Sequence, residues 1–460
     1  MAKASKRKLV AIVLAAGQGT RMHSQIPKVL HSICGQAMID HVLEALRPLD
    51  VDQIYVVTGH QHEVVKAHIG TRAICVLQKE RLGTAHAVKM VAPRLKGFDG
   101  DVLIMVGDAP LIKPETLRDL VNRRRSHHTA CVVLTTMLDN PQGYGRIVRN
   151  RDNTVRKIVE QKDTNTYEEK INEINTGTYC FDARRLLESL AKVTNNNAQK
   201  EYYLTDTVEI LQDAGHEVEA SVCEDSSEVI GVNRRADMAM AEKFLRLRIL
   251  NQLMDSGVTI IDPSTTYIDN TVRIGIDTKI HPFTILQGAT VIGEQCEIGP
   301  NVTVRNARLG RDVRVRNSVI EDSSIDSGVT VGPYALVRRG ALLRQDAHAG
   351  TFVEVAGSDV GRSTQIRHLS YVGDAHIGDD SYIGAGAMTI NFDGKTVHRT
   401  EIGDGVFIGS NALLMAPIKI PDHAQVGPNA VVEARDATGQ ADVPLAKPPA
   451  RKAARKGARK

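Results

Sequence analysis

The residues with the clearest chemical potential follow the first predicted strand. Residues 10–14 form an apolar, β-branched run typical of a buried parallel strand. The string Leu14-Ala15-Ala16-Gly17-Gln18-Gly19-Thr20-Arg21-Met22 ends that run, and Pro27-Lys28 comes shortly after it. A glycine turn lets backbone N–H groups approach a ligand closely. Those donors, with the positive charges of Arg21 and Lys28, favour a site for a polyphosphate.

Two common phosphate-binding motifs do not fit this string. The Walker loop needs Gly-Lys-Ser/Thr, and the dinucleotide fingerprint needs a third glycine where Met22 stands. The string with its Lys28 resembles instead the signature of sugar-nucleotide pyrophosphorylases, which join a nucleoside triphosphate to a sugar 1-phosphate. The alternative is a plain glycine turn at the end of a strand.

Size and composition narrow the class of protein. A chain of 460 residues is long for one core, so we expect two or three domains. The net charge of +4 comes from a tail, 446–460, which we expect to be disordered rather than a nucleic-acid-binding arm. No apolar stretch reaches the roughly 20 residues of a membrane span. Six scattered cysteines favour free thiols and a cytoplasmic location.

The first 234 residues alternate predicted strands with amphipathic helices. We expect strands at 10–14, 53–58, 73–77, 101–105 and 130–135, with helices such as 38–46 and 114–124 between them. This order predicts a doubly wound α/β domain that binds ligands at the carboxyl ends of its strands. Residues 235–256 predict a linker helix with an apolar stripe. The stripe would contain Met238, Ala241, Phe244, Leu245, Ile249, Leu250 and Leu253.

A six-residue repeat occupies residues 257–445. Aliphatic–glycine pairs recur at or near this interval, among them Ile292-Gly293, Ile298-Gly299, Ile377-Gly378 and Ile383-Gly384. One inward aliphatic residue in every six builds a parallel β-helix. The coil resembles the left-handed β-helix of hexapeptide acyltransferases, which are usually trimers. The insertion 391–395 interrupts the period and could reach a neighbouring subunit.

The order of pyrophosphorylase motif, long helix and hexapeptide coil resembles the bifunctional GlmU family. That family fuses an N-acetylglucosamine-1-phosphate uridyltransferase to a glucosamine-1-phosphate N-acetyltransferase, and it makes UDP-N-acetylglucosamine for peptidoglycan and lipopolysaccharide. The resemblance implies a homotrimer that uses Mg²⁺. Its implied substrates are UTP, N-acetylglucosamine 1-phosphate, glucosamine 1-phosphate and acetyl-CoA.

The resemblance also implies roles for residues of the first half. Arg21 and Lys28 would act on the phosphates, and Asp108 and Asn233 would hold magnesium. The residues expected to bind UTP or UDP-N-acetylglucosamine are Leu14, Ala15, Ala16, Gly17, Lys28, Gln78, Gly83, Thr84, Asp108, Gly145, Glu160, Asn175 and Asn233. Val106 stands where the family usually has an aromatic residue.

In the second half the family pattern is only partly kept. The resemblance makes His368 the base, places Arg338 and Tyr371 on the acetyl acceptor, and assigns acetyl-CoA to Ala385, Asn391, Phe392 and Ser410. The departures from the family are Ala356 and Val397 for lysines, Tyr382 for an asparagine, Phe392 for a tyrosine, Pro428 for an alanine and Leu445 for an arginine. Lys395 and Arg399 are close enough in sequence to compensate.

Several alternatives stay open at this stage. The second half could acetylate glucosamine 1-phosphate, acylate another amine, or serve only trimer assembly. A non-catalytic sugar-nucleotide sensor is a further alternative, although a sensor would not need the metal pair. The histidine pairs His60/His62 and His127/His128 have no aligned third ligand, so we expect solvated loop histidines rather than a metal site.

Overall fold

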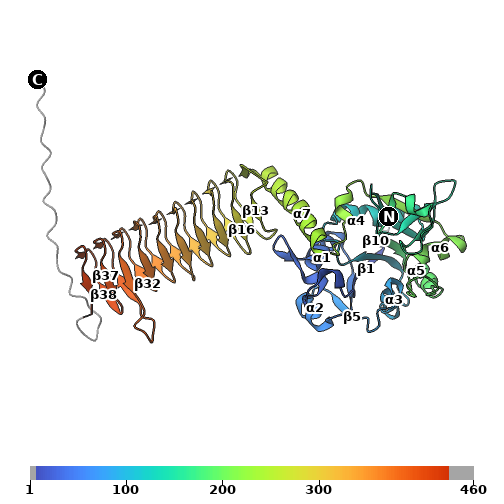
Figure 1. The fold of residues 1–460 in the computed structure, drawn as a ribbon, viewed down its shortest axis with the longest axis horizontal. Coiled ribbons are helices and arrows are strands. Elements are labelled where there is room, and N and C mark those ends of the chain that lie inside the picture. Colours follow the sequence, from blue (N-terminus) through green and yellow to red (C-terminus); the bar gives the residue numbers. More distant parts are fainter. Residues whose placement is uncertain (1–6, 435–460) are drawn as a thin grey trace, which may run out of the picture. The chain divides into compact units, whose positions relative to one another are not determined.

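A computed structural model describes residues 7–434. The chain divides into two compact units between Leu245 and Arg246 (Figure 1). The predictions for the tail 446–460 and for Leu445 lie outside the described residues. Within the described range, no helix is both long enough and apolar enough to cross a bilayer.

The first unit is built on a nine-stranded mixed sheet with β1 in its interior. β1 (Lys8–Ala15) runs parallel to β4 (Gln53–Thr58) on one side and to β6 (Gly100–Val106) on the other. β10 (Glu173–Asp182) lies antiparallel between β6 and β7. The remaining strands of the sheet are β5 (Ile74–Leu77), β7 (Cys131–Met137), β8 (Arg146–Arg149), β9 (Val155–Val159) and β11 (Val218–Val222).

Helices cover both faces of this sheet. Alternate residues of a strand point to opposite faces, so Val10 and Ile12 enter one core while Ala11 and Val13 enter the other. The first core is completed by α3 (Thr84–Lys89), α5 (Ala183–Leu190) and α6 (Asp206–Asp213). The second is completed by α1 (Met38–Leu46), α2 (His62–Ile69) and α4 (Pro114–His127). The doubly wound α/β prediction is confirmed.

The predicted long helix is α7 (Arg235–Asp255). Its buried residues include Ala241, Leu245, Ile249 and Leu250. Phe244 is 37% exposed, so its assignment to the buried stripe was wrong. Asp237, in the first turn, accepts hydrogen bonds from the backbone N–H groups of Asn233 and Arg234 at 3.1 and 2.8 Å. The start of α7 therefore fixes the segment that carries Asn233.

The second unit is a parallel β-helix with three flat sheets (Figure 1). The first sheet contains β12 (Thr259–Ile260), β15 (Lys279–Ile280), β18 (Glu297–Ile298), β21 (Arg314–Val315), β24 (Thr330–Val331), β27 (His348–Ala349), β30 (Gln365–Ile366), β33 (Tyr382–Ile383), β36 (Phe407–Ile408) and β39 (Gln425–Val426). The second contains β13 (Tyr267–Ile268), β16 (Ile285–Gln287), β19 (Thr303–Arg305), β22 (Val319–Glu321), β25 (Leu336–Arg338), β28 (Glu354–Ala356), β31 (Tyr371–Gly373), β34 (Met388–Ile390), β37 (Leu413–Met415) and β40 (Val431–Val432). The third contains β14 (Arg273–Ile274), β17 (Val291–Ile292), β20 (Arg308–Leu309), β23 (Ser324–Ile325), β26 (Leu342–Leu343), β29 (Asp359–Val360), β32 (Ala375–Ile377), β35 (Thr400–Ile402) and β38 (Ile418–Ile420).

Close backbone contact between coils explains the aliphatic–glycine pairs. Inward aliphatics stack in register, as Ile366, Ile383 and Ile408 do. The residue that follows each first-sheet strand, from β24 onward, forms the corner column. The corner column contains Gly332, Gly350, Arg367, Gly384, Gly409 and Gly427. A Cβ on Gly350 would lie 1.7 Å from the carbonyl oxygen of the next coil, so this position excludes a side chain.

We predict that Gly350→Ala destabilises the β-helix, whereas Gly427→Ala in the same column does not. A Cβ at Gly427 meets no atom within 4 Å. Overpacking of this kind costs about 1–3 kcal/mol, so the melting temperature of the second unit should fall by several degrees in the first variant. Thermal unfolding of the full chain followed by circular dichroism measures this. Equal melting temperatures for the two variants would contradict the explanation.

Candidate functional site

A cavity of about 480 Å³ opens at the carboxyl ends of β1, β5 and β6, where a doubly wound fold binds its ligands. It is lined by Leu14, Ala16, Gly17, Gln18, Gln78, Arg81, Gly83, Thr84, Ala87, Val106, Asp108 and Glu201. Most of the residues predicted to bind the nucleotide are in this set. Ala15 is not, because its side chain packs into the core on the opposite face of the sheet.

The glycines of the first loop have different roles. A Cβ on Gly17 would meet no atom within 4 Å, so Gly17 borders open space in the cavity. Gly19 has a φ of +65°, and a Cβ there would lie 2.7 Å from the Cβ of Lys28. Gly19 is therefore needed both for its backbone conformation and for the passage of the Lys28 side chain.

The four side chains predicted to bind phosphate or magnesium are joined by direct polar contacts. The Lys28 ammonium contacts the Asp108 carboxylate and donates a hydrogen bond to Asn233 Oδ1 at 2.7 Å. Arg21 donates to the same amide oxygen at 2.8 Å. The backbone N–H of Val232 donates to the carbonyl of Asp108 at 2.9 Å, which ties the two oxygen-bearing segments together. Arg21, Lys28, Asp108 and Asn233 form the cation node.

The cation node fits a magnesium ion chemically. Its carboxylate and amide oxygens are hard donors, and both already contact one ammonium group, so a single small cation can reach both. Magnesium usually keeps several waters and needs only one or two protein oxygens beside phosphate oxygens. Over residues 7–434, no cluster of three or more His, Cys, Asp or Glu offers a metal site of another kind.

Gln78 has a fixed orientation in the cavity wall. Its side chain is buried, and its amide nitrogen donates to the carbonyl of Gly83 at 3.1 Å and lies 2.9 Å from His86 Nδ1. Because the carbonyl of Gly83 can only accept a hydrogen bond, the Gln78 nitrogen must face it. The amide oxygen of Gln78 is left as the acceptor for a ligand.

A second group of predicted residues lies next to the cavity wall. The backbone N–H of Asn175 donates to the carbonyl of Gly145 at 2.9 Å, and its side chain donates to the Tyr179 hydroxyl at 2.7 Å. Glu160 accepts a hydrogen bond from Thr205 at 3.1 Å. Burial, with repulsion from neighbouring carboxylates, raises the pKa of Glu160. The pKa of Tyr179 is raised by burial and then by the charge of Glu160, so these groups lie close together.

The sequence did not single out three residues on the cavity wall: Gln18, Arg81 and Glu201. Arg81 donates to the Gln18 side chain at 3.0 Å, and both residues adjoin motifs that were recognised. Glu201 had no such signal. It reaches the cavity because the backbone of Tyr202 pairs with Leu82 and Ala85 at 2.7 and 2.9 Å.

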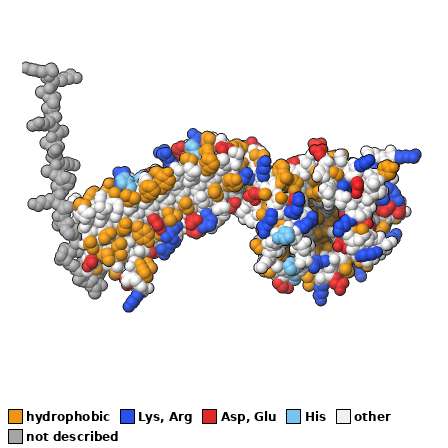
Figure 2. All heavy atoms as spheres, viewed as in Figure 1, with side chains coloured by type: hydrophobic (Ala, Val, Ile, Leu, Met, Phe, Trp, Pro, Cys, Tyr) orange, Lys and Arg blue, Asp and Glu red, His pale blue; other side chains and the backbone are white. Residues whose placement is uncertain are grey.

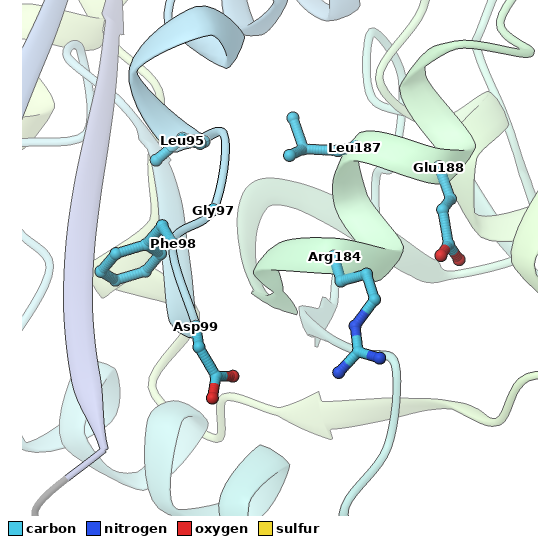
Figure 3. A pocket seen from close by; sticks show the side chains of 7 residues that line it. All are labelled: Leu95, Gly97, Phe98, Asp99, Arg184, Leu187 and Glu188. Carbon is cyan, nitrogen blue, oxygen red and sulfur yellow. The ribbon is translucent and has the colours of Figure 1, made fainter.

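A separate cavity of about 370 Å³ lies between the amino end of β6 and α5 (Figure 3). Its walls are Leu95, Gly97, Phe98, Asp99, Arg184, Leu187 and Glu188. Glu188 is paired with Arg185 at 2.8 Å. This cavity contains none of the predicted residues and lies at the opposite end of β6 from Asp108, so we do not assign the site to it.

Predicted acceptor residues of the second unit lie on its second sheet. Arg338 on β25 donates a hydrogen bond from Nε to Glu354 on β28 at 2.8 Å, and its Nη2 forms an ion pair with the same carboxylate oxygen at 2.7 Å. The Tyr371 ring on β31 lies over Gly373, because a Cβ there would be 2.3 Å from the hydroxyl. The same hydroxyl lies 3.4 Å from the amide nitrogen of Asn391.

Other predicted residues of this unit occupy turns. His368 is exposed between β30 and β31. Ala385 and Ser410 each follow a glycine of the corner column, so they stack in successive coils, and Pro428 continues the stack. Phe392 is 56% exposed in the insertion, where its backbone pairs with Val397.

The substituted positions have definite environments. Ala356 is fully buried on β28. The Tyr382 ring stacks on Phe407 with 5.3 Å between ring centroids and 7° between planes. The guanidinium of Arg367 lies 5.4 Å above the Tyr382 ring.

Two histidines differ from the expectation of solvated loop residues. His62 is the first residue of α2, and its ring nitrogen is hydrogen-bonded to Thr58. His127 is the last residue of α4 and pairs with Glu219 at 2.6 Å. Each of these imidazole rings therefore has a polar side-chain partner that the fold brings close, rather than water alone.

Comparisons with known proteins agree with this arrangement. A family model described as a MobA-like NTP transferase domain matches residues 11–203. Two hexapeptide models match the coil: bacterial transferase hexapeptide (six repeats) over 271–306, and the hexapeptide repeat of succinyl-transferase over 399–434. "Bifunctional protein GlmU" of Streptococcus suis is 47% identical, covering 89% of both chains. The proteins of that name from Geobacillus sp. and Acetivibrio thermocellus are 46% and 45% identical, each covering 92% of this chain and 93% and 92% of their own.

Proposed function

The chain belongs to the bifunctional GlmU family, and from this membership we propose that it makes UDP-N-acetylglucosamine in two reactions. One transfers an acetyl group from acetyl-CoA to glucosamine 1-phosphate. The other transfers a uridylyl group from UTP to N-acetylglucosamine 1-phosphate. The observation that carries the second reaction is the cation node, whose Asp108 lines the cavity. We assign uridylyl transfer to residues 1–234, a linker helix to 235–256 and acetyl transfer to 257–445.

Uridylyl transfer is an in-line displacement. A phosphate oxygen of N-acetylglucosamine 1-phosphate attacks the α-phosphorus of UTP, and the bond to pyrophosphate breaks. Both reactants are anions, so the protein has to hold them together and neutralise their charge. Lys28 and Arg21 are the positive groups placed for this task, and no covalent intermediate on the protein is needed.

Asp108 and Asn233 would hold the magnesium ion. When bound, magnesium supplies neutralisation of the phosphate charge. Lys28 contacts one oxygen of each residue, so its ammonium would lie beside the ion and could donate to the phosphates.

Gln78 supports uracil as the base. Uracil presents an N–H donor between two carbonyl acceptors on its pairing edge, and the Gln78 amide oxygen is left to accept from such a donor. Cytosine and adenine carry an unprotonated ring nitrogen at that position. A site built around a buried acceptor rejects a base that leaves it unpaired.

For acetyl transfer, His368 is the proposed base. A neutral imidazole can take a proton from the amine as it attacks the thioester carbonyl, while the coenzyme A thiolate leaves. Arg338 and Tyr371 would contact the acceptor, and Ala385, Asn391, Phe392 and Ser410 would contact acetyl-CoA. The second candidate function of this half is assembly only, and the buried Ala356 in place of a lysine favours it.

We propose a homotrimer in the cytoplasm. Exposed apolar side chains cover parts of the β-helix surface (Figure 2). Four of them stand in turns between the first and second sheets: Phe283, Tyr334, Phe352 and Leu369. Such a row suits burial against other copies of the chain. All six cysteines are free thiols, which suits a reducing compartment.

We predict that Lys28→Ala lowers the rate of uridylyl transfer at least a hundredfold, because one of the two cations at the phosphates is lost. The measurement is pyrophosphate release from UTP and N-acetylglucosamine 1-phosphate. Lys66→Ala, on the exposed side of α2, is the matched control and should retain full activity. Unchanged turnover in Lys28→Ala would refute the assignment, and no turnover in the parent chain would favour the sensor.

We predict that the chain releases thiol from acetyl-CoA when glucosamine 1-phosphate is added, and that His368→Ala lowers this rate at least a hundredfold. The folding control is thermal unfolding of the variant, whose melting temperature should match that of the parent chain. Uridylyl transfer should also be unchanged, since the two reactions use different units. Failure of the parent chain to release thiol would favour the assembly role for the β-helix.

A further inference from the structure

Arg367 interrupts the corner column. Every other member of this column from β24 onward is glycine, and several of those positions exclude a Cβ because the next coil is too close. The replacement of one glycine by the largest cationic side chain therefore has to be accommodated by the coil. It occurs directly before His368, the proposed base.

Among residues 7–434, the guanidinium of Arg367 has no acidic partner. In the described part of the chain, no carboxylate lies within ion-pair distance of it, and its recorded contact is the Tyr382 ring at 5.4 Å. Neighbouring arginines behave differently: Arg338, Arg339, Arg344 and Arg362 each pair with a carboxylate. A half-buried cation held against an aromatic ring, without a counter-ion, is suited to bind an anionic ligand.

The surroundings of His348 show that Arg367 and His368 are close together. It precedes Arg367 by one coil, on β27. Its pKa is lowered by burial, and then by the charges of Arg367 and His368. The turn at the end of β30 thus places Arg367, its permanent positive charge, close to His368 and His348.

The covalent structure of the acceptor specifies where its phosphate must lie. In glucosamine 1-phosphate the amine and the phosphate are on adjacent ring carbons. When the amine is at the base, the phosphate is therefore only a few ångströms away. A cation beside His368 meets this requirement, and its charge, unlike that of Arg338, is not shared with a carboxylate such as Glu354.

We propose that Arg367 binds the phosphate of the acetyl acceptor, in place of the cations that the family has at positions 356 and 397. This inference depends on the proposed acetyl transfer. The planar guanidinium can donate two parallel hydrogen bonds to phosphate oxygens. Tyr382, supported by Phe407, holds it in position.

The test compares two acceptors in the thiol-release assay. Arg367→Gly restores the residue type of the column and should raise KM for glucosamine 1-phosphate at least tenfold. The KM for glucosamine, which has no phosphate, should stay within twofold, and Arg367→Lys should recover part of the loss. Arg362→Ala is the matched control, because this arginine is 70% exposed in the preceding turn. It should leave both constants unchanged.

An equal rise of KM for both acceptors, or no change for either, would overturn the proposal. So would a selective rise in Lys395→Ala or Arg399→Ala but not in Arg367→Gly. If the parent chain releases no thiol, acetyl transfer itself fails. Calorimetry with glucosamine 1-phosphate then decides. If the parent chain binds this ligand and Arg367→Gly does not, the phosphate site is supported. If the parent chain shows no binding, or if the variant binds equally well, the phosphate site is rejected.

Discussion

One ammonium group, that of Lys28, connects the parts of the first unit that carry its chemistry. It is shared between the Asp108 carboxylate, which follows β6, and the Asn233 amide, which precedes α7. The side chains of Lys28 and Asp108 are only 11% and 21% exposed, so each charge depends on the other for compensation. Gly19 has no Cβ that would clash with the Lys28 side chain, and Asp237 anchors the segment of Asn233 through a hydrogen bond. Loss of any of these contacts would move apart the Asp108 and Asn233 oxygens that would bind a metal–nucleotide complex.

A different constraint governs the β-helix. Each coil lies so close to the next that most corner positions exclude a side chain, and the inward aliphatics stack in register. Functional side chains can therefore stand only at the remaining positions. These are turns such as that of His368, outward positions on the second sheet such as Arg338 and Tyr371, and the insertion 391–395. Arg367 stands out because it occupies a corner position and keeps its charge uncompensated by any described carboxylate.

The sequence predicted those features that depend on period and on the ends of strands. The strand at 53–58 and the helix at 38–46 have the expected bounds, and the hexapeptide period fixed the three-sheet coil. Asp108 and Gln78 were found through the family resemblance, and their places just after strands agree with ligand binding at the carboxyl ends of parallel strands. Glu201 could not be found, since backbone pairing with a distant loop brings it to the cavity. The partners of His62 and His127 likewise depend on tertiary contacts rather than on local pattern.

The most direct test of the central claim is calorimetry of UTP with the full chain, in magnesium and in EDTA, for the parent protein and for Asp108→Asn. If Asp108 and Asn233 receive the ion while Lys28 contacts the phosphates, magnesium should tighten UTP binding at least tenfold in the parent. The variant should lose most of this gain. No heat of binding in the parent, or the same affinity with and without magnesium, would contradict the account.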